Sequence, residues 1–292
     1  MEIITITIVI TLRVIANPIG NVFQKRLTIR GRHPLFINFF TYLSLGIFCL
    51  IPSSLIDWRI YPVEFWYNVS IAGLLGALGN GFLVKALEKG ELSVLGPINS
   101  YKSIVGIIFG IFLLGEMPNA WGLLGIALIV LGSYFVLDSK EEPFSIRLFF
   151  KAEIQYRILA MIFTAIEAVF IKRIILLSST EVAFICWCIF GAIFSFFLLP
   201  IYKIKTIPAF SILSSKDYVF FTLLIISIGL MQITTNYAFK LMDVGYALSL
   251  FQLSVIVSIL LGYKIFQESA IHRKLFGALI MIIGSVLIIL LK

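Results

Sequence analysis

The segment from Leu95 to Glu116, LGPINSYKSIVGIIFGIFLLGE, decides the fold. Its apolar run has the length of a membrane-spanning helix, for which roughly 20 residues are needed. Lys102 is its one charge before the closing Gly115-Glu116. A lone charge at this depth is expensive in lipid, so it predicts a helix that faces a cavity or a partner.

Similar apolar runs follow one another along the whole chain. Of its 292 residues, 60% are hydrophobic and 13% are charged, whereas soluble domains have roughly 45–50% apolar and about 25% charged residues. A soluble globule of this size could not hide so much apolar surface from water. We therefore expect an all-α integral membrane protein with ten transmembrane helices. They are expected at residues 4–23, 35–55, 67–88, 92–114, 119–138, 157–177, 182–201, 218–240, 246–266 and 271–291.

Composition also argues against several classes of function. The net charge of +8 is spread over many short loops, so no nucleic-acid partner is expected. The only histidines, His33 and His272, have no carboxylate or cysteine at ligand spacing. We expect no metal, no cofactor and no enzymatic activity. The three cysteines, Cys49, Cys186 and Cys188, are expected to be small core residues.

The chain divides into two halves that resemble each other. The longest hydrophilic break, residues 139–156, is expected to link a first five-helix repeat, residues 1–138, to a second, residues 157–292. Several pairs lie at one constant offset: Gly115-Glu116 with Gln267-Glu268, Gly125 with Gly277, and Gly132-Ser133 with Gly284-Ser285. An odd number of helices per half inserts the second half upside down. The prediction is two inverted repeats around a central cavity, which is the design of secondary transporters.

These same residues carry a resemblance to a known family. Residues 95–102, the ending Leu114-Gly115-Glu116 and the helix with Gly122 and Gly132 resemble the EamA branch of the drug/metabolite transporter superfamily. Gly20-Asn21 with Lys25 resembles the end of the family's first helix, and Lys172 holds the corresponding place in the sixth. The resemblance implies a ten-helix basket with a central cavity, helices five and ten on its outside, and a role in metabolite transport.

Three ionisable residues mark the candidate site. Arg13, Lys102 and Glu167 lie near the middle of the predicted helices one, four and six. Because charges at mid-bilayer are rare and usually face a cavity or a partner, they predict a shared polar site. We expect substrate binding by the basic and amide residues near this depth: Lys102, Arg13, Asn17, Asn21, Asn99, Tyr101, Asn80, Gln232, Asn236 and Gln252.

Each of these residues also has a structural interpretation. The stripe of Arg13, Asn17 and Asn21 could pack against another helix, and Gln232 with Asn236 could be polar glue between helices. Lys102 and Glu167 could form an ion pair that only fixes the fold. Alternatively, Glu167 could carry a coupling proton, because burial and nearby cations act in opposite directions on the proton affinity of a carboxylate.

The expected function is secondary transport by alternating access. The substrate is expected to be a small polar metabolite, either an amino acid or an organic anion; the alternatives are export of cationic drugs or a non-transport membrane scaffold. We expect a monomer or homodimer that contacts lipid and a small-molecule substrate in the bacterial cytoplasmic membrane. Basic residues gather in the odd-numbered loops, which places those loops in the cytoplasm and both termini outside. The family resemblance implies the opposite, with both termini in the cytoplasm.

Overall fold

The fold is an all-α bundle, as predicted. The computed structural model describes residues 2–90, 92, 95, 98–137, 150–204, 213–267 and 271–290, and this part of the chain contains helices and no strand. The first repeat contains α1 (Glu2–Ile29), α2 (Pro34–Ser54), α3 (Val63–Lys89), α5 (Lys102–Leu114) and α6 (Ala120–Leu137). The second contains α7 (Ala152–Leu177), α8 (Thr180–Ile201), α10 (Ser215–Leu241), α11 (Val244–Leu250), α12 (Ser254–Phe266) and α13 (Ile271–Leu290). Three 3-10 turns, η1 (Trp58–Ile60), η2 (Asn99–Tyr101) and η4 (Phe251–Leu253), lie between them.

Several of these helices suit a membrane by length and composition. Within the described residues, six segments are long and apolar enough to cross one: Ile3–Ile29, Pro34–Ser54, Val63–Lys89, Thr180–Ile201, Ser215–Leu241 and Val244–Phe266. Shorter apolar helices cover Lys102–Leu114, Ala120–Gly132 and Leu275–Gly284. The chain is therefore a multi-pass membrane protein. Among the described residues, each of the ten predicted ranges overlaps a helix, and the fourth and ninth each contain a 3-10 turn, η2 or η4.

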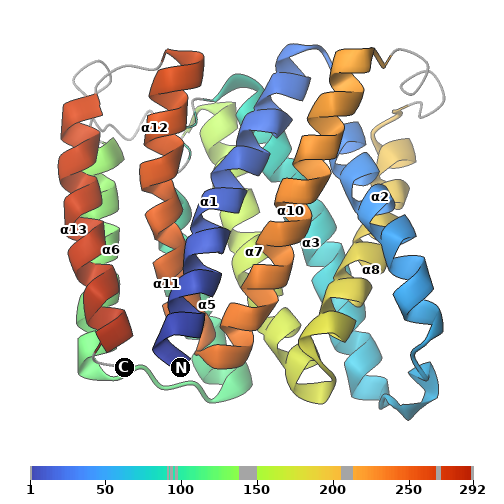
Figure 1. The fold of residues 1–292 in the computed structure, drawn as a ribbon, viewed down its shortest axis with the longest axis horizontal. Coiled ribbons are helices and arrows are strands. Elements are labelled where there is room, and N and C mark those ends of the chain that lie inside the picture. The colour runs from blue at the N-terminus through green and yellow to red at the C-terminus, as the bar shows by residue number, and fades with distance from the viewer. Residues whose placement is uncertain are drawn as a thin grey trace.

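The two repeats pack with approximate two-fold symmetry. Contacts of α3 with α7 match those of α1 with α10, while α2 packs on α8 and α6 packs on α13. The contact of α5 with α7 is matched by that of α12 with α1. In Figure 1, α1 rises from the lower end of the bundle, where α13 ends, and α7 descends from the upper end. The repeats are thus inverted relative to each other.

The matching ends of helices α5 and α12 support the same symmetry. Helices α5 and α12 both follow a 3-10 turn, and both end on a residue in the left-handed conformation, Gly115 with φ 70° and Gln267 with φ 58°. Glycine adopts this conformation readily, whereas glutamine does so rarely. The conformation is kept in both repeats although only one of them retains the glycine.

Helices α6 and α13 form a close pair at one edge of the bundle (Figure 1). A Cβ added at Gly132 would come within 2.5 Å of the Gly277 carbonyl oxygen, and one at Gly284 within 2.5 Å of the Gly125 carbonyl oxygen. Small residues let the two backbones touch, as in other membrane helix pairs. This pair accounts for the constant spacing of the four glycines and leaves the remaining helices to build the centre.

The cysteines are core residues, as predicted. Cys49, Cys186 and Cys188 are free and buried. Between the last two, the Trp187 ring lies 4.6 Å from that of Tyr42.

Candidate functional site

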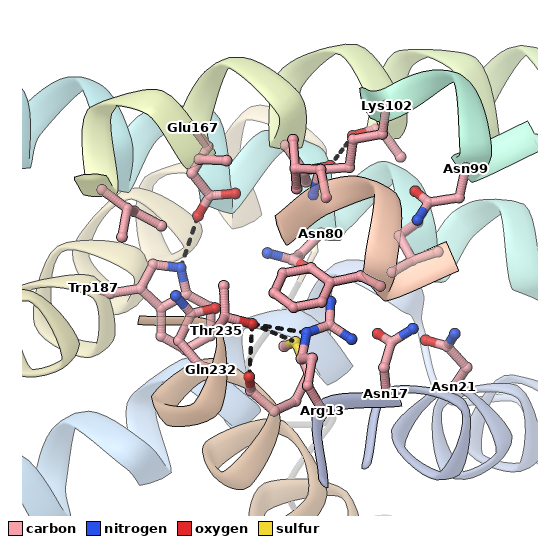
Figure 2. Close-up of a pocket in the computed structure, with 18 of the residues that line it drawn as sticks. Arg13, Asn17, Asn21, Asn80, Asn99, Lys102, Glu167, Trp187, Gln232 and Thr235 are labelled. Carbon is pink, nitrogen blue, oxygen red and sulfur yellow. Dashed lines mark hydrogen bonds between the residues drawn. The ribbon is translucent and has the colours of Figure 1, made fainter. Parts of the chain in front are cut away.

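A central cavity lies between helices of both repeats. Its wall combines polar and apolar side chains from α1, α3, α5, α7, α8, α10, α11 and the two turns η2 and η4. Figure 2 shows the polar side chains converging on one space from several helices. The lining residues are Arg13, Asn17, Asn21, Asn80, Leu83, Asn99, Lys102, Arg157, Ala160, Thr164, Glu167, Ala168, Ile171, Trp187, Met231, Gln232, Thr235, Phe239, Leu248 and Phe251.

Arg13 is held in the cavity wall by neutral groups. Its Nε donates a hydrogen bond of 2.7 Å to the Thr235 hydroxyl, and its guanidinium lies 4.5 Å from the centre of the Phe251 ring. The side chain is buried, and its Nη1 has no hydrogen-bond partner among the described residues. Buried arginine is normally paired with an anion, so this group is left able to bind one.

Lys102 and Glu167 line the cavity at separate points of its wall (Figure 2). The Glu167 carboxylate accepts a hydrogen bond of 2.7 Å from Trp187 Nε1. Lys102 interacts electrostatically with Glu167, Arg13 and Arg157. Among the described ion pairs, which require 4.0 Å or less, none joins Lys102 to Glu167. The fold-fixing ion pair considered for these two residues is therefore absent from this conformation.

Arg157 is a cavity residue that sequence reasoning missed. The predicted helix six began at this residue, whereas α7 begins at Ala152 and places Arg157 inside the bundle. Its side chain is buried, and its Nε donates a hydrogen bond of 2.8 Å to the Leu95 carbonyl oxygen. A basic residue at the start of an apolar run was the available signal, but uncertainty of a few residues in the helix boundary hid its depth.

Four predicted asparagines border the cavity. Asn80 donates to the Tyr42 hydroxyl at 2.8 Å, and Asn99 donates to Gln252 Oε1 at 3.3 Å. Asn17 and Asn21 follow Arg13 along α1 (Figure 2), and the Asn21 Oδ1 is buried without a hydrogen-bond partner among the described residues. These amides supply donors and acceptors for a polar solute.

Three other predicted site residues do not border it. Asn236 is fully buried, and it accepts a hydrogen bond from Gln232, which does line the cavity. Asn236 also donates to the Thr180 carbonyl oxygen. Gln252 is likewise fully buried and donates to the Leu248 carbonyl oxygen. Tyr101 is also absent from the cavity wall. The first two support residues that line the cavity, and any direct binding role for the three stays a prediction.

A second polar cluster lies at the end of the bundle that holds both termini. Lys172 Nζ is 2.8 Å from Glu116 Oε1 and donates to the Met242 carbonyl oxygen at 2.9 Å. Glu116 Oε2 accepts a hydrogen bond of 2.9 Å from the Val244 amide. The cluster therefore joins the end of α5 to α7 and to the connection between α10 and α11, so it links the two repeats.

Comparison with known proteins agrees with this architecture. The model of the EamA-like transporter family matches residues 6–138 and, a second time, residues 152–290. The chain belongs to this family. It is accordingly a membrane transporter of the drug/metabolite transporter superfamily, and each half of the bundle is one copy of the family's unit.

A solved structure is similar over nearly the whole chain. It is a crystal structure whose description gives only "protein". The match covers 97% of this chain and 95% of the chain in that structure, with a TM-score of 0.73 and 16% sequence identity. At this identity the likeness shows the fold alone. A search of curated protein sequences finds no match.

Proposed function

We propose that this EamA-family protein is a secondary transporter that moves a small organic anion or amino acid through the central cavity by alternating access. The observation that carries the proposal is the charge of the cavity wall. Among the described lining residues, Arg13, Lys102 and Arg157 oppose the single acid Glu167. Fully ionised, the wall has a formal charge of three minus one, or +2, which favours an anionic group on the solute.

The inverted repeats support alternating access. Transporters of this design rock one repeat against the other around a site near the midplane. The cluster of Glu116 with Lys172 joins the repeats on one side of the cavity. We propose that this contact closes the cavity toward the termini and breaks when that side opens.

Transport of cationic drugs is the less favoured alternative. Such a solute would need Glu167 as its partner, yet this carboxylate already accepts the Trp187 hydrogen bond and is outnumbered by three cations. A scaffold has no use for a polar cavity inside the membrane, where buried charges are costly.

Glu167 is the proposed proton carrier. It is the only acid among the described cavity-lining residues, and it lies where Lys102 and a bound solute can alter its proton affinity. If it carries the coupling proton, Glu167→Gln should lose pH-driven accumulation and keep exchange of solute for solute. Persistence of the wild-type pH dependence in a folded Glu167→Gln protein would exclude the role, and loss of every transport mode would indicate a structural one.

The proposal is tested with purified protein in liposomes. Vesicles loaded with one unlabelled solute from a panel of organic anions, amino acids and organic cations receive the same labelled solute outside. We expect saturable exchange for at least one anion or zwitterion. Exchange of cations alone would support the drug-exporter alternative, and no exchange of any class would count against a carrier.

We also propose the bacterial cytoplasmic membrane as the location of the protein, and a monomer or homodimer as its working form.

A further inference from the structure

The two arginines of the cavity wall are both buried, and both are hydrogen-bonded to neutral oxygens. Each is fixed through Nε to a neutral oxygen: Arg13 to the Thr235 hydroxyl and Arg157 to the Leu95 carbonyl. Both side chains are buried, at 7% exposure. Among the described residues neither has a carboxylate within ion-pair distance. Both therefore face the cavity with their charge uncompensated and their position set.

The remaining charges do not relieve this surplus. Lys102 is the cation that interacts with Glu167, and it is also repelled by Arg13 and Arg157. If Lys102 and Glu167 offset each other, a charge of +2 remains on the two arginines. Uncompensated charge of this kind is costly in a buried site, so the bound state should contain two negative charges to balance it.

The local geometry suits anion binding. An Nε bond leaves the terminal Nη groups of an arginine available, and these groups bind a carboxylate or phosphate in bidentate fashion. The Phe251 ring covers one face of the Arg13 guanidinium. The edge of the guanidinium, including the buried and unpartnered Nη1, stays available for hydrogen bonds to an anion. The nearby amides of Asn17 and Asn80 can bind the uncharged polar atoms of the same solute.

We infer that the solute is a dianion, either a dicarboxylate or a phosphate monoester, and that Arg157 sets the preference for two negative charges over one. This inference rests on the proposed function, since it concerns the same cavity. It narrows the expected substrate to a class of net charge −2 and assigns a specificity role to a residue outside the predicted site. An amino acid zwitterion would leave the charge of the two arginines unbalanced.

The test compares solutes that differ in charge but share a skeleton. Succinate and monomethyl succinate are the matched pair, and glycerol 3-phosphate is the phosphate probe. Affinities are measured with the full-length protein from the rise of its unfolding temperature with ligand concentration, and uptake is measured in liposomes. We expect succinate or glycerol 3-phosphate to bind at least about tenfold more tightly than monomethyl succinate, since hydrogen bonds between charged groups are the strong ones. Which of the two dianions binds better distinguishes dicarboxylate from phosphate.

Variants separate specificity from folding. Arg157→Gln should lower the ratio of dianion to monoanion affinity about tenfold or more, and Arg157→Lys, which keeps the charge, should retain most of it. Arg26→Gln is the control, because Arg26 lies outside the cavity over the Phe220 ring. A merely structural Arg157 would weaken both affinities equally and leave the ratio unchanged, which would overturn the inference. Equal binding of monomethyl succinate and both dianions by the wild type would overturn it while the proposed function stands; absence of transport for every anion and zwitterion tested would remove the proposed function itself.

Discussion

Replacing Gly76 with alanine should displace the Glu167 carboxylate. Gly76 lies on α3 where that helix packs against α7. A Cβ at this position would collide with Glu167 Oε1 and lie 3.1 Å from both the Glu167 carboxyl carbon and the Tyr42 hydroxyl oxygen. No rotation of an alanine relieves the contact, so either the Glu167 side chain turns away or the two helices separate.

The expected magnitude follows from what Glu167 loses. Turning away breaks its 2.7 Å hydrogen bond with Trp187, and a hydrogen bond to a charged group contributes about 1.5–3 kcal/mol. Alanine regains up to about 1 kcal/mol through its higher helix propensity. The net destabilisation should be about 0.5–2 kcal/mol. Transport should fall more severely, because the acid no longer occupies its place in the cavity wall.

Thermal unfolding in detergent and solute exchange in liposomes measure the two effects. Gly46→Ala on α2 is the matched control, because its Cβ would lie 3.6 Å from the nearest atom, the Cys188 carbonyl oxygen, which is an ordinary contact. We expect near-normal stability and exchange from the control and a clear loss of both from Gly76→Ala. Equal behaviour of the two variants would refute the assigned packing of Glu167.

Three further predictions concern other parts of the molecule. Lys102→Ala should abolish transport, because Lys102 lines the cavity, and should leave folding near normal, because a buried lysine is costly to the fold. A fully active variant, measured by solute exchange, would contradict this. Glu116→Gln removes the charge partner of Lys172 and should increase thiol labelling of a cysteine placed at Asp243; unchanged labelling would mean that the cluster does not close that side. By the positive-inside rule, a cysteine in residues 26–33 should resist an impermeant reagent in intact cells, and labelling from outside would reverse the assigned orientation.

Periodicity and repeat spacing were enough to predict the architecture. The constant offset of Gly125 with Gly277 and Gly132 with Gly284 reflects a real constraint, because these glycines let α6 and α13 touch. An apolar run of membrane length can hardly fold otherwise. The break of the ninth helix into α11, η4 and α12 was not predicted, since no proline or glycine lies at the turn.

The site was predictable only in part. Arg13, Lys102 and Glu167 were identified because an ionisable group in the middle of the membrane is costly and usually faces a cavity or a partner. The spacing of polar residues along the helix could not distinguish Gln232, which lines the cavity, from Asn236, which is fully buried and does not line it. Helical periodicity gives the face on which a residue lies, and the neighbouring helix decides whether that face meets a cavity or another backbone.

Access to one cavity from both sides of the membrane tests the central claim most directly. Asn17 lines the cavity on α1, and Asn17→Cys can be made in a protein whose three native cysteines are replaced. Impermeant thiol reagents are then applied to either face of sealed vesicles, with and without solute. Alternating access predicts labelling from each face, with bound solute reducing both. Labelling from one face only, whatever the solute, would contradict the account, and a membrane current through a pathway open to both faces at once would indicate a channel.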